Sequence, residues 1–216
     1  MNNFVLVLFS AAILSAQAPI VQPGAPGMSS KIISSAAAAV PWHPPSEADF
    51  SFMEGMIMHH SQAVEMVDLL RTRGLSKNLK SFGDRISISQ TDEIKYMKQW
   101  LADRGRPVSE GHNMADMKGM DHSMMNHGAM AMPLMPGMLT PEQMKTLAAA
   151  KGAAFDHLFL TGMIQHHGGA LTMVEDLFNT AGAGQDAVLF DFATDIENTQ
   201  SAEIKIMQGM LLKEKK

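Results

Sequence analysis

The sequence of 216 residues contains no cysteine, which excludes disulfide bonds and thiolate metal ligands. Aromatic side chains are also few, with one tyrosine and two tryptophans. Lys and Arg number 17 against 22 Asp and Glu, so the formal net charge is −5. Nucleic-acid binding depends on clustered positive charge, and this acidic balance argues against nucleic acid as a partner. The absence of cysteine also means that any sulfur ligand for a soft metal ion must be the thioether of methionine rather than a thiolate.

Long apolar runs are scarce as well, and the clearest one lies at the start of the chain, from Phe4 to Leu14. It is shorter than the roughly 20 residues that a membrane-spanning helix needs. A small-x-small cleavage pattern, Ala-Gln-Ala, follows at residues 16–18. We therefore predict a signal peptide over residues 1–18 and a mature protein that is periplasmic or otherwise exported, with no membrane span. An uncleaved membrane anchor is the alternative, because no Lys or Arg precedes the apolar run.

The segment after the predicted signal, residues 19–45, is rich in Pro, Gly, Ser and Ala and has no apolar periodicity. We predict it to be a linker. Beyond it, apolar residues recur at helical spacing, and no alternating β-branched run predicts a strand. The expected organisation is a helical hairpin over 46–105, a Met/His-rich connecting loop over 106–140 and a second helical hairpin over 141–216.

Helix-capping signals divide each hairpin into two helices. Ser46, with Asp49 three residues later, resembles a capping box at the start of the first helix. Thr140 followed by Pro141 is the equivalent start signal for the third helix. We expect helices over about 46–73, 76–104, 140–181 and 185 to near the C-terminus.

The two hairpins carry the same motif, so the sequence is internally duplicated. Residues 49–67 read Asp-x-x-Phe-x-x-Gly-Met-Ile-x-His-His-x-x-Ala-x-x-Met-Val, and residues 156–174 repeat this pattern at an offset of 107. In the following helices, Gln-x-x-Glu-Ile-Lys-x-Met at 90–97 recurs at 200–207. Two copies of a helical hairpin predict an all-α protein, an antiparallel four-helix bundle with pseudo-twofold symmetry.

The histidine pair of each copy follows a methionine at helical spacing. With about 100° of rotation per residue, His59 and His60 flank the direction of Met56, one turn further along the helix. Met56 and one of these histidines can therefore reach the same ion. Neutral imidazole combined with thioether sulfur suits copper, Cu(I) above all, with Cu(II) and Ag(I) as further candidates. The second copy offers the equivalent set, Met163, His166 and His167.

The alternative interpretation of these residues is structural, because methionine often fills gaps in a core. A buried histidine can equally belong to a hydrogen-bonded network, and one Gln and one Glu of each copy are the candidates to orient the histidines. These four residues are Gln90, Glu93, Gln200 and Glu203. Four further methionines are open to either a ligand role or a core role: Met66, Met97, Met173 and Met207.

The connecting loop carries a second, independent signal, since the stretch from His112 to Met138 contains nine methionines and three histidines. Gly, Pro, Asp and Asn interrupt any helix there, so few of these methionines can be core. We predict copper binding, with the Met-x-x-Met-x-x-Met run at 114–120 as its sharpest part. A low-complexity linker, or an oxidation sink that forms methionine sulfoxide, is the alternative. The candidate ligands are His112, Met114, Met117, Met120, His122, Met124, Met125 and His127.

The two linked motifs of each copy resemble the bacterial family known as domain of unknown function 305. The resemblance covers about residues 46–212, apart from the Met-rich loop. It implies a ferritin-like fold and a periplasmic copper-binding protein that contributes to copper tolerance. The ligands that it implies are Met56, His59, His60 and Met66 in the first copy and Met163, His166, His167 and Met173 in the second.

We expect sequestration or delivery of copper without turnover, with copper ions as the ligand and other copper-handling envelope proteins as partners. A ferritin-like redox enzyme is the competing hypothesis. Di-iron bundles need Glu-x-x-His on two helices, and no glutamate in this sequence has a histidine three residues later. Oxidation of Cu(I) stays open, because His and Met serve both copper states. A purely structural bundle that binds a partner is the third hypothesis.

Overall fold

The computed structural model describes residues 20–22, 28–33, 44–108 and 134–214. The chain divides into two compact units, Met1–Trp42 and His43–Lys216.

The first unit contains two short strands, β1 (Ile20–Gln22) and β2 (Lys31–Ile33). They pair antiparallel, with Ile20 opposite Ile33. The prediction that the chain has no strand is therefore wrong for this part of the expected linker. Each strand holds two adjacent β-branched residues, which favour extended backbone, but three residues are too few to give a detectable alternation.

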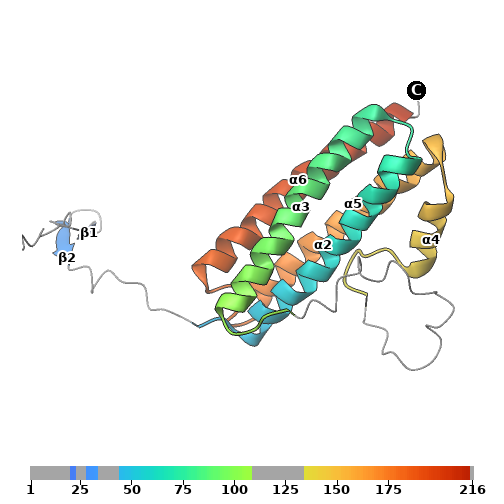
Figure 1. Cartoon of the computed structure of the whole chain (residues 1–216). Coiled ribbons are helices and arrows are strands. Elements are labelled where there is room, and N and C mark those ends of the chain that lie inside the picture. The colour runs from blue at the N-terminus through green and yellow to red at the C-terminus, as the bar shows by residue number, and fades with distance from the viewer. Residues whose placement is uncertain (1–19, 23–27, 34–43, 109–133, 215–216) are drawn as a thin grey trace, which may run out of the picture. The chain divides into compact units, whose positions relative to one another are not determined.

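The second unit is built from helices, which confirms the all-α prediction for its described residues. Four long helices lie side by side, and a short fifth helix lies beside them (Figure 1). The long helices are α2 (Glu47–Arg73), α3 (Lys77–Asp103), α5 (Gly152–Asn179) and α6 (Ala187–Glu214), and the short one is α4 (Pro141–Ala149). α2 packs on α3, α5 packs on α6, and α2 also packs on α5. No helix in the described part of the chain combines the length and the apolar character that crossing a bilayer requires.

The predicted helix starts are confirmed at both capping boxes. Ser46 accepts a hydrogen bond from the backbone N–H of Asp49, and the Asp49 carboxylate accepts one from the backbone N–H of Ser46. Thr140 and Gln143 make the same reciprocal pair at the start of α4. Each box satisfies two backbone donors that have no partner within the helix, so local sequence sets these boundaries.

The prediction of one continuous helix over about 140–181 is wrong, because the chain breaks between α4 and α5. Gly152 adopts a φ of +63°, a left-handed conformation that glycine reaches without a Cβ penalty. The backbone here also forms an isolated parallel bridge with Gly74, at the turn between α2 and α3. Lys151 precedes α5 without a side-chain cap, so the sequence gives no local capping signal for this start.

Two buried aspartates brace the hairpins against each other. Asp49 on α2 accepts the backbone N–H of Gly184, in the turn between α5 and α6, at 2.7 Å. Asp156 on α5 accepts the backbone N–H groups of Leu75 and Ser76, in the turn between α2 and α3, at 2.9 and 2.8 Å. Each copy of the motif thus uses its first residue to hold the turn of the other copy.

The apolar core of the helical unit falls into two clusters with a polar layer between them. Along α2 the first cluster ends at Ile57 and the second begins at Ala63, and the histidine pair lies between these positions. The order is the same along α6 and reversed along α3 and α5. In all three helices polar residues occupy the interval between the clusters: Gln90, Glu93, the second histidine pair, Gln200 and Glu203. The duplicated motif therefore produces one continuous polar layer across the middle of the helices.

Candidate metal centre

The polar layer contains four histidines whose side chains are fully buried. His59 and His60 come from α2, and His166 and His167 come from α5, each with 0% exposure. They are buried because they occupy the core-facing positions of their helices, one turn beyond a buried methionine. Adjacent residues differ by about 100° around a helix, so each pair points one ring toward its own hairpin and one toward the other hairpin.

Within each hairpin, one histidine is held by a glutamate from the neighbouring helix. Nε2 of His60 lies 2.6 Å from Oε2 of Glu93, and Nε2 of His167 lies 2.7 Å from Oε2 of Glu203. Burial raises the pKa of Glu93, but the hydrogen bonds that it accepts from His60 and Ser89 outweigh this effect and leave the pKa lowered. The carboxylates accept from Nε2, as the sequence analysis expected for the two glutamates, and this leaves Nδ1 as the free ring nitrogen.

The other two histidines meet across the interface between the hairpins. The rings of His59 and His166 lie 3.8 Å apart between centroids, at an interplanar angle of 41°. Nε2 of His59 donates to the backbone oxygen of Pro136 at 2.9 Å, and Nε2 of His166 donates to the backbone oxygen of His59 at 2.9 Å. A carbonyl oxygen can only accept, so Nε2 carries the proton in both rings.

Burial keeps these two stacked imidazoles neutral. It lowers the pKa of His59 to about 3, with the neighbouring His60 adding to the effect. Burial lowers the pKa of His166 well below its usual value. A neutral imidazole has a free lone pair on the nitrogen that lacks the proton, which is the form that binds metal ions.

Eight buried polar atoms in this layer have no hydrogen-bond partner among the described residues. Four are the Nδ1 atoms of the histidines, and four are the side-chain amide atoms of Gln90 and Gln200. The glutamines were expected to orient the histidines, and in the structure they do not bond to them. A buried polar group without a partner costs about 1–3 kcal/mol, so these atoms are candidates to bind a guest. A bound ion would use the free electron pairs.

Buried methionines flank this layer on both sides. Met56 and Met97 belong to the first apolar cluster, and Met163 and Met207 belong to the second. All four side chains are fully buried, and the two pairs correspond to each other in the duplicated motif. Thioether sulfur is thus available within the core next to the imidazoles on either side.

Met66 and Met173 pack across the interface between α2 and α5. A Cβ on Gly162 would lie 3.3 Å from Cε of Met66, and a Cβ on Gly55 would lie 3.4 Å from Cε of Met173. Each methionine therefore lies against a glycine of the opposite helix and shares that space with a residue of the connecting segment, Leu139 at Gly162 and Met135 at Gly55. This contact accounts for both residues as packing, and a ligand role for them stays a prediction.

The candidate ligands of the connecting loop lie outside the described residues: His112, Met114, Met117, Met120, His122, Met124, Met125 and His127. Their predicted role in copper binding stays a prediction.

The donor types in the layer restrict the metals that it fits. Within the described ranges, no group of three or more His, Asp and Glu side chains is arranged to hold a metal ion. Zinc and hard-cation sites rely on such groups, or on cysteine. The remaining way to complete a site here is to add thioether sulfur or amide oxygen to the imidazole nitrogens, and this combination suits copper.

The last part of the connecting loop, Leu134–Thr140, crosses the histidine layer, and we call this segment the strap. Besides the bond from His59 to Pro136, Leu139 exchanges two hydrogen bonds with the side chain of Gln62, at 2.9 and 2.7 Å. On α5 a Cβ at Gly169 would lie 1.9 Å from the oxygen of Pro136, so the strap passes directly over this glycine.

The strap has no motif of its own in the sequence, although one signal for it is present. Gln62 and Gly169 occupy equivalent positions of the duplicated motif but differ in type. The structure explains this difference, because Gln62 binds the strap while Gly169 makes room for it. A mismatch at a buried position of a repeat is therefore a marker for a contact that only one copy makes.

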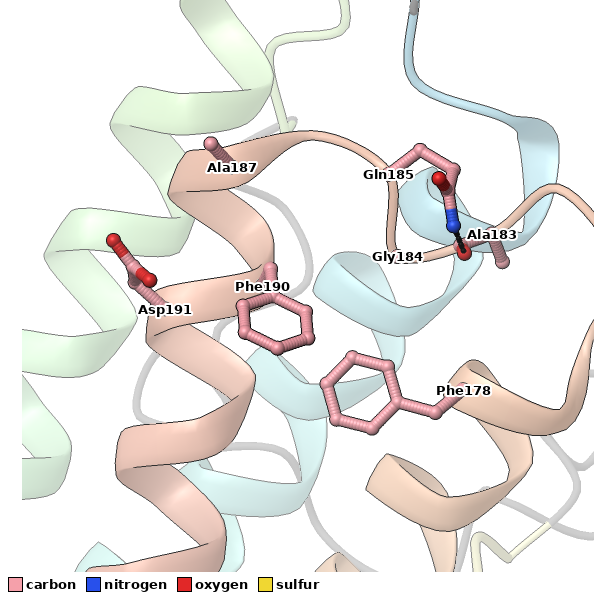
Figure 2. Close-up of a pocket in the computed structure, with 7 residues that line it drawn as sticks. All are labelled: Phe178, Ala183, Gly184, Gln185, Ala187, Phe190 and Asp191. Atoms are coloured by element: carbon pink, nitrogen blue, oxygen red, sulfur yellow. Dashed lines mark hydrogen bonds between the residues drawn. The ribbon is translucent and has the colours of Figure 1, made fainter. Parts of the chain in front are cut away.

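A hollow of about 500 Å³ lies elsewhere, at the turn between α5 and α6 (Figure 2). Phe178 and Phe190 face each other in it, with ring centroids 5.3 Å apart. Its lining contains no histidine or methionine: Phe178, Ala183, Gly184, Gln185, Ala187, Phe190 and Asp191. This hollow is thus separate from the histidine layer.

Residues 49–211 match the protein family described as Domain of unknown function (DUF305). No curated protein matches the chain. A DUF305 protein from Streptomyces coelicolor, described as a candidate secreted protein, has a similar structure, with a TM-score of 0.61 at 28% identity over 77% of this chain and 93% of the other. The structure of CopM in its Cu(I)-bound form has a TM-score of 0.55 at 28% identity, over 80% of this chain and 98% of CopM. The structure of CopM in its Cu(II)-bound form has a TM-score of 0.54 at 33% identity, over 75% of this chain and 94% of CopM.

Proposed function

Since the chain belongs to the domain of unknown function 305 family, we propose that it is an exported copper-binding protein that sequesters or delivers copper. The similarity to CopM, whose structures hold Cu(I), Cu(II) or Ag, supports binding of these metals. In this proposal the protein works in the periplasm or an equivalent exported location and contributes to copper tolerance. Other copper-handling proteins of the envelope would supply or receive the ion.

The observation that carries this proposal is the set of four buried Nδ1 atoms without partners. Each ring already uses Nε2 in a hydrogen bond, so its remaining lone pair is available for a metal ion. Met56 and Met97 border the layer on one side, and their counterparts border it on the other side. Neutral imidazole and thioether together favour Cu(I), which is why Cu(I) is the main cargo in this proposal.

We interpret the fold as an antiparallel four-helix bundle of the ferritin-like kind, made of two duplicated hairpins. The packing of α2 on α3, of α5 on α6 and of α2 on α5 supports this interpretation. The reciprocal braces made by Asp49 and Asp156 support it as well, because equivalent residues of the two copies make equivalent contacts. Ligands from facing helices are the usual way in which such bundles build metal sites.

We propose binding without turnover. The redox alternative, a Cu(I) oxidase, predicts saturable O₂ consumption that depends on Cu(I), and binding alone would not produce it. The structural alternative takes its support from the bonds between His60 and Glu93 and between His167 and Glu203. It predicts that copper affinity does not depend on these histidines.

An anaerobic Cu(I) titration of the full-length protein against a competing chelator tests the proposal. The decisive variant is His60→Gln with His167→Gln, because glutamine can still donate to the glutamates but has no ring nitrogen to offer. We expect its Cu(I) affinity to fall about tenfold or more, since loss of a ligand costs at least as much as loss of a supporting residue. A variant that lacks residues 112–130 keeps the strap and measures the share of the connecting loop.

The matched control is His157→Gln, which changes a histidine on the surface of α5 that is paired with Glu214. Its affinity should equal that of the unchanged protein. Thermal unfolding by circular dichroism establishes that each variant is folded. If the double variant is folded and binds Cu(I) as tightly as the unchanged protein, the histidines are structural and the proposed site is wrong.

A further inference from the structure

The two glutamines in the polar layer differ from the other buried glutamine of the bundle. Gln90 on α3 is 3% exposed and Gln200 on α6 is 2% exposed, and neither amide has a partner within the described residues. Gln62, at 4% exposure, has both amide atoms bonded to the backbone of Leu139. Burial alone therefore does not explain unpaired glutamine amides in this protein.

The position of the two glutamines places them with the metal donors rather than with the hydrophobic core. Gln90 lies one helical turn before Glu93, and Gln200 lies one turn before Glu203, the two residues that hold the histidines. On both α3 and α6 they occupy the interval between the two apolar clusters. The same unpaired amide thus occurs twice, at equivalent positions of the duplicated motif.

The unpaired groups of the layer are mostly electron-pair donors. Each histidine uses Nε2 in a hydrogen bond, and in the neutral ring this makes Nδ1 a lone-pair donor; the two amide oxygens add two more donors. Only the two amide NH₂ groups are hydrogen-bond donors. A guest that fits this set must accept electron pairs at most of its contacts, so a cation fits and an anion does not.

We propose that the amide oxygens of Gln90 and Gln200 are ligands in this layer and that they extend its binding from Cu(I) to Cu(II). This inference rests on the proposed copper-binding function. Thioether sulfur favours the reduced ion, whereas nitrogen and oxygen donors together favour the oxidised ion. With imidazole nitrogen common to both, the methionines serve Cu(I) and the glutamines serve Cu(II), so one buried layer accepts both oxidation states.

The test is the variant Gln90→Met with Gln200→Met in the full-length protein. Methionine has nearly the same volume and is apolar, and it replaces an oxygen donor by a thioether. We expect Cu(II) affinity to fall about tenfold or more, as is typical when a metal site loses a supporting or coordinating group. Cu(I) affinity should stay within about threefold, because imidazole and thioether donors remain. Cu(II) and Cu(I) affinities are measured by chelator competition, the latter without oxygen.

A second measurement, on the metal-free proteins, separates a ligand role from a structural one. The double variant removes four unpaired polar atoms, so its thermal midpoint should equal or exceed that of the unchanged protein. The matched control, Gln62→Met, leaves the backbone groups of Leu139 without partners, so its midpoint should fall.

The outcomes are distinguishable. A selective loss of Cu(II) affinity with an unchanged or higher metal-free midpoint supports the proposal. Unchanged Cu(II) affinity overturns it, and so does a joint loss of both affinities with a lower midpoint, which would make the glutamines structural. If the unchanged protein binds neither ion, the copper-binding function itself fails, independently of the glutamines.

Discussion

The two hairpins use one of their histidines in the same way and the other differently. His60 and His167 are both bonded through Nε2 to a glutamate of the neighbouring helix. His59 donates instead to the strap, at the backbone oxygen of Pro136, whereas His166 donates to the backbone oxygen of His59 itself. The duplicated motif alone does not account for this difference, because the four histidines occupy equivalent positions in it.

The strap is the cause of the difference. It contacts Gln62 of the first hairpin through two hydrogen bonds and passes over Gly169 of the second hairpin without room for a side chain. Only one copy of the segment exists, so it cannot contact both hairpins in the same way. The comparison indicates that the recurring sequence motif supplies the residues of the polar layer, while the end of the connecting loop makes its two stacked histidines unequal.

The largest expected effect concerns the stacked histidines and pH. Their pKa values are lowered in the folded protein, that of His59 to about 3, so between pH 6.5 and 4.5 the unfolded chain takes up protons that the folded protein does not. Stability is therefore present above pH 6.5 and is lost as the pH falls, by about 1.4 kcal/mol per pH unit for each histidine.

Urea unfolding of the metal-free protein at several pH values measures this slope. Carboxylates begin to titrate at the lower end of this window, so the slope between pH 6.5 and about 5.5 reports mainly on the histidines. A free energy of unfolding that stays flat across this window would mean that the stacked pair is not held neutral by burial.

The second prediction concerns the brace by which Asp156 on α5 holds the turn between α2 and α3. Asp156→Ala removes the acceptor for two backbone N–H groups and should lower the free energy of unfolding by about 3 kcal/mol or more. Asp156→Asn retains one acceptor oxygen and should lose about half as much. Equal stability of both variants and the unchanged protein, measured by denaturant unfolding, would exclude a bracing role for this carboxylate.

The third prediction addresses the asymmetry itself, at two adjacent glycines of α5. Gly169→Ala places a methyl group against the strap and should destabilise the protein by about 1–3 kcal/mol. A Cβ at Gly168 meets no atom within 4 Å in the described part of the chain. Gly168→Ala should therefore stabilise the protein by about 0.5–1 kcal/mol through helix propensity. Thermal midpoints that shift in the same direction would contradict the position of the strap.

The smallest effect is expected at a residue that has no counterpart in the other hairpin. His157 is paired with Glu214 on the surface, and the equivalent position of the first copy is Phe50. Exposed ion pairs contribute little, so His157→Ala should change the free energy of unfolding by less than about 0.5 kcal/mol. A larger loss in denaturant unfolding would show that this unduplicated pair also contributes substantially to stability.

Local sequence was sufficient to predict the helix starts at Ser46 and Thr140 and the glutamates that hold the histidines. A capping box involves residues three apart, so it does not depend on the rest of the fold. The contacts between the histidines and the glutamates join neighbouring helices, and the recurrence of both motifs in the two halves of the sequence is what indicated them. Burial of both histidine pairs follows from the helical periodicity. The histidine pairs and the glutamates are detectable in the sequence because both recur in the two halves of the chain.

The features that the sequence analysis missed depend on contacts between distant segments. The break at Gly152 coincides with a bridge to Gly74, and the strap contacts residues that lie 77 positions earlier in the chain. Periodicity within a window cannot detect such pairings. The strands at 20–22 and 31–33 were missed for another reason, because three residues are too short for the alternation that marks a strand.

Nitrogen NMR of the histidine side chains tests most directly whether copper binds in the buried layer. In the metal-free protein, His59, His60, His166 and His167 should each show a protonated Nε2 and an unprotonated Nδ1. Addition of Cu(I) without oxygen should shift the Nδ1 signals of this layer and leave that of His157 in place. If Cu(I) binds and these Nδ1 signals do not change, copper is held elsewhere, and the histidine layer is a structural network.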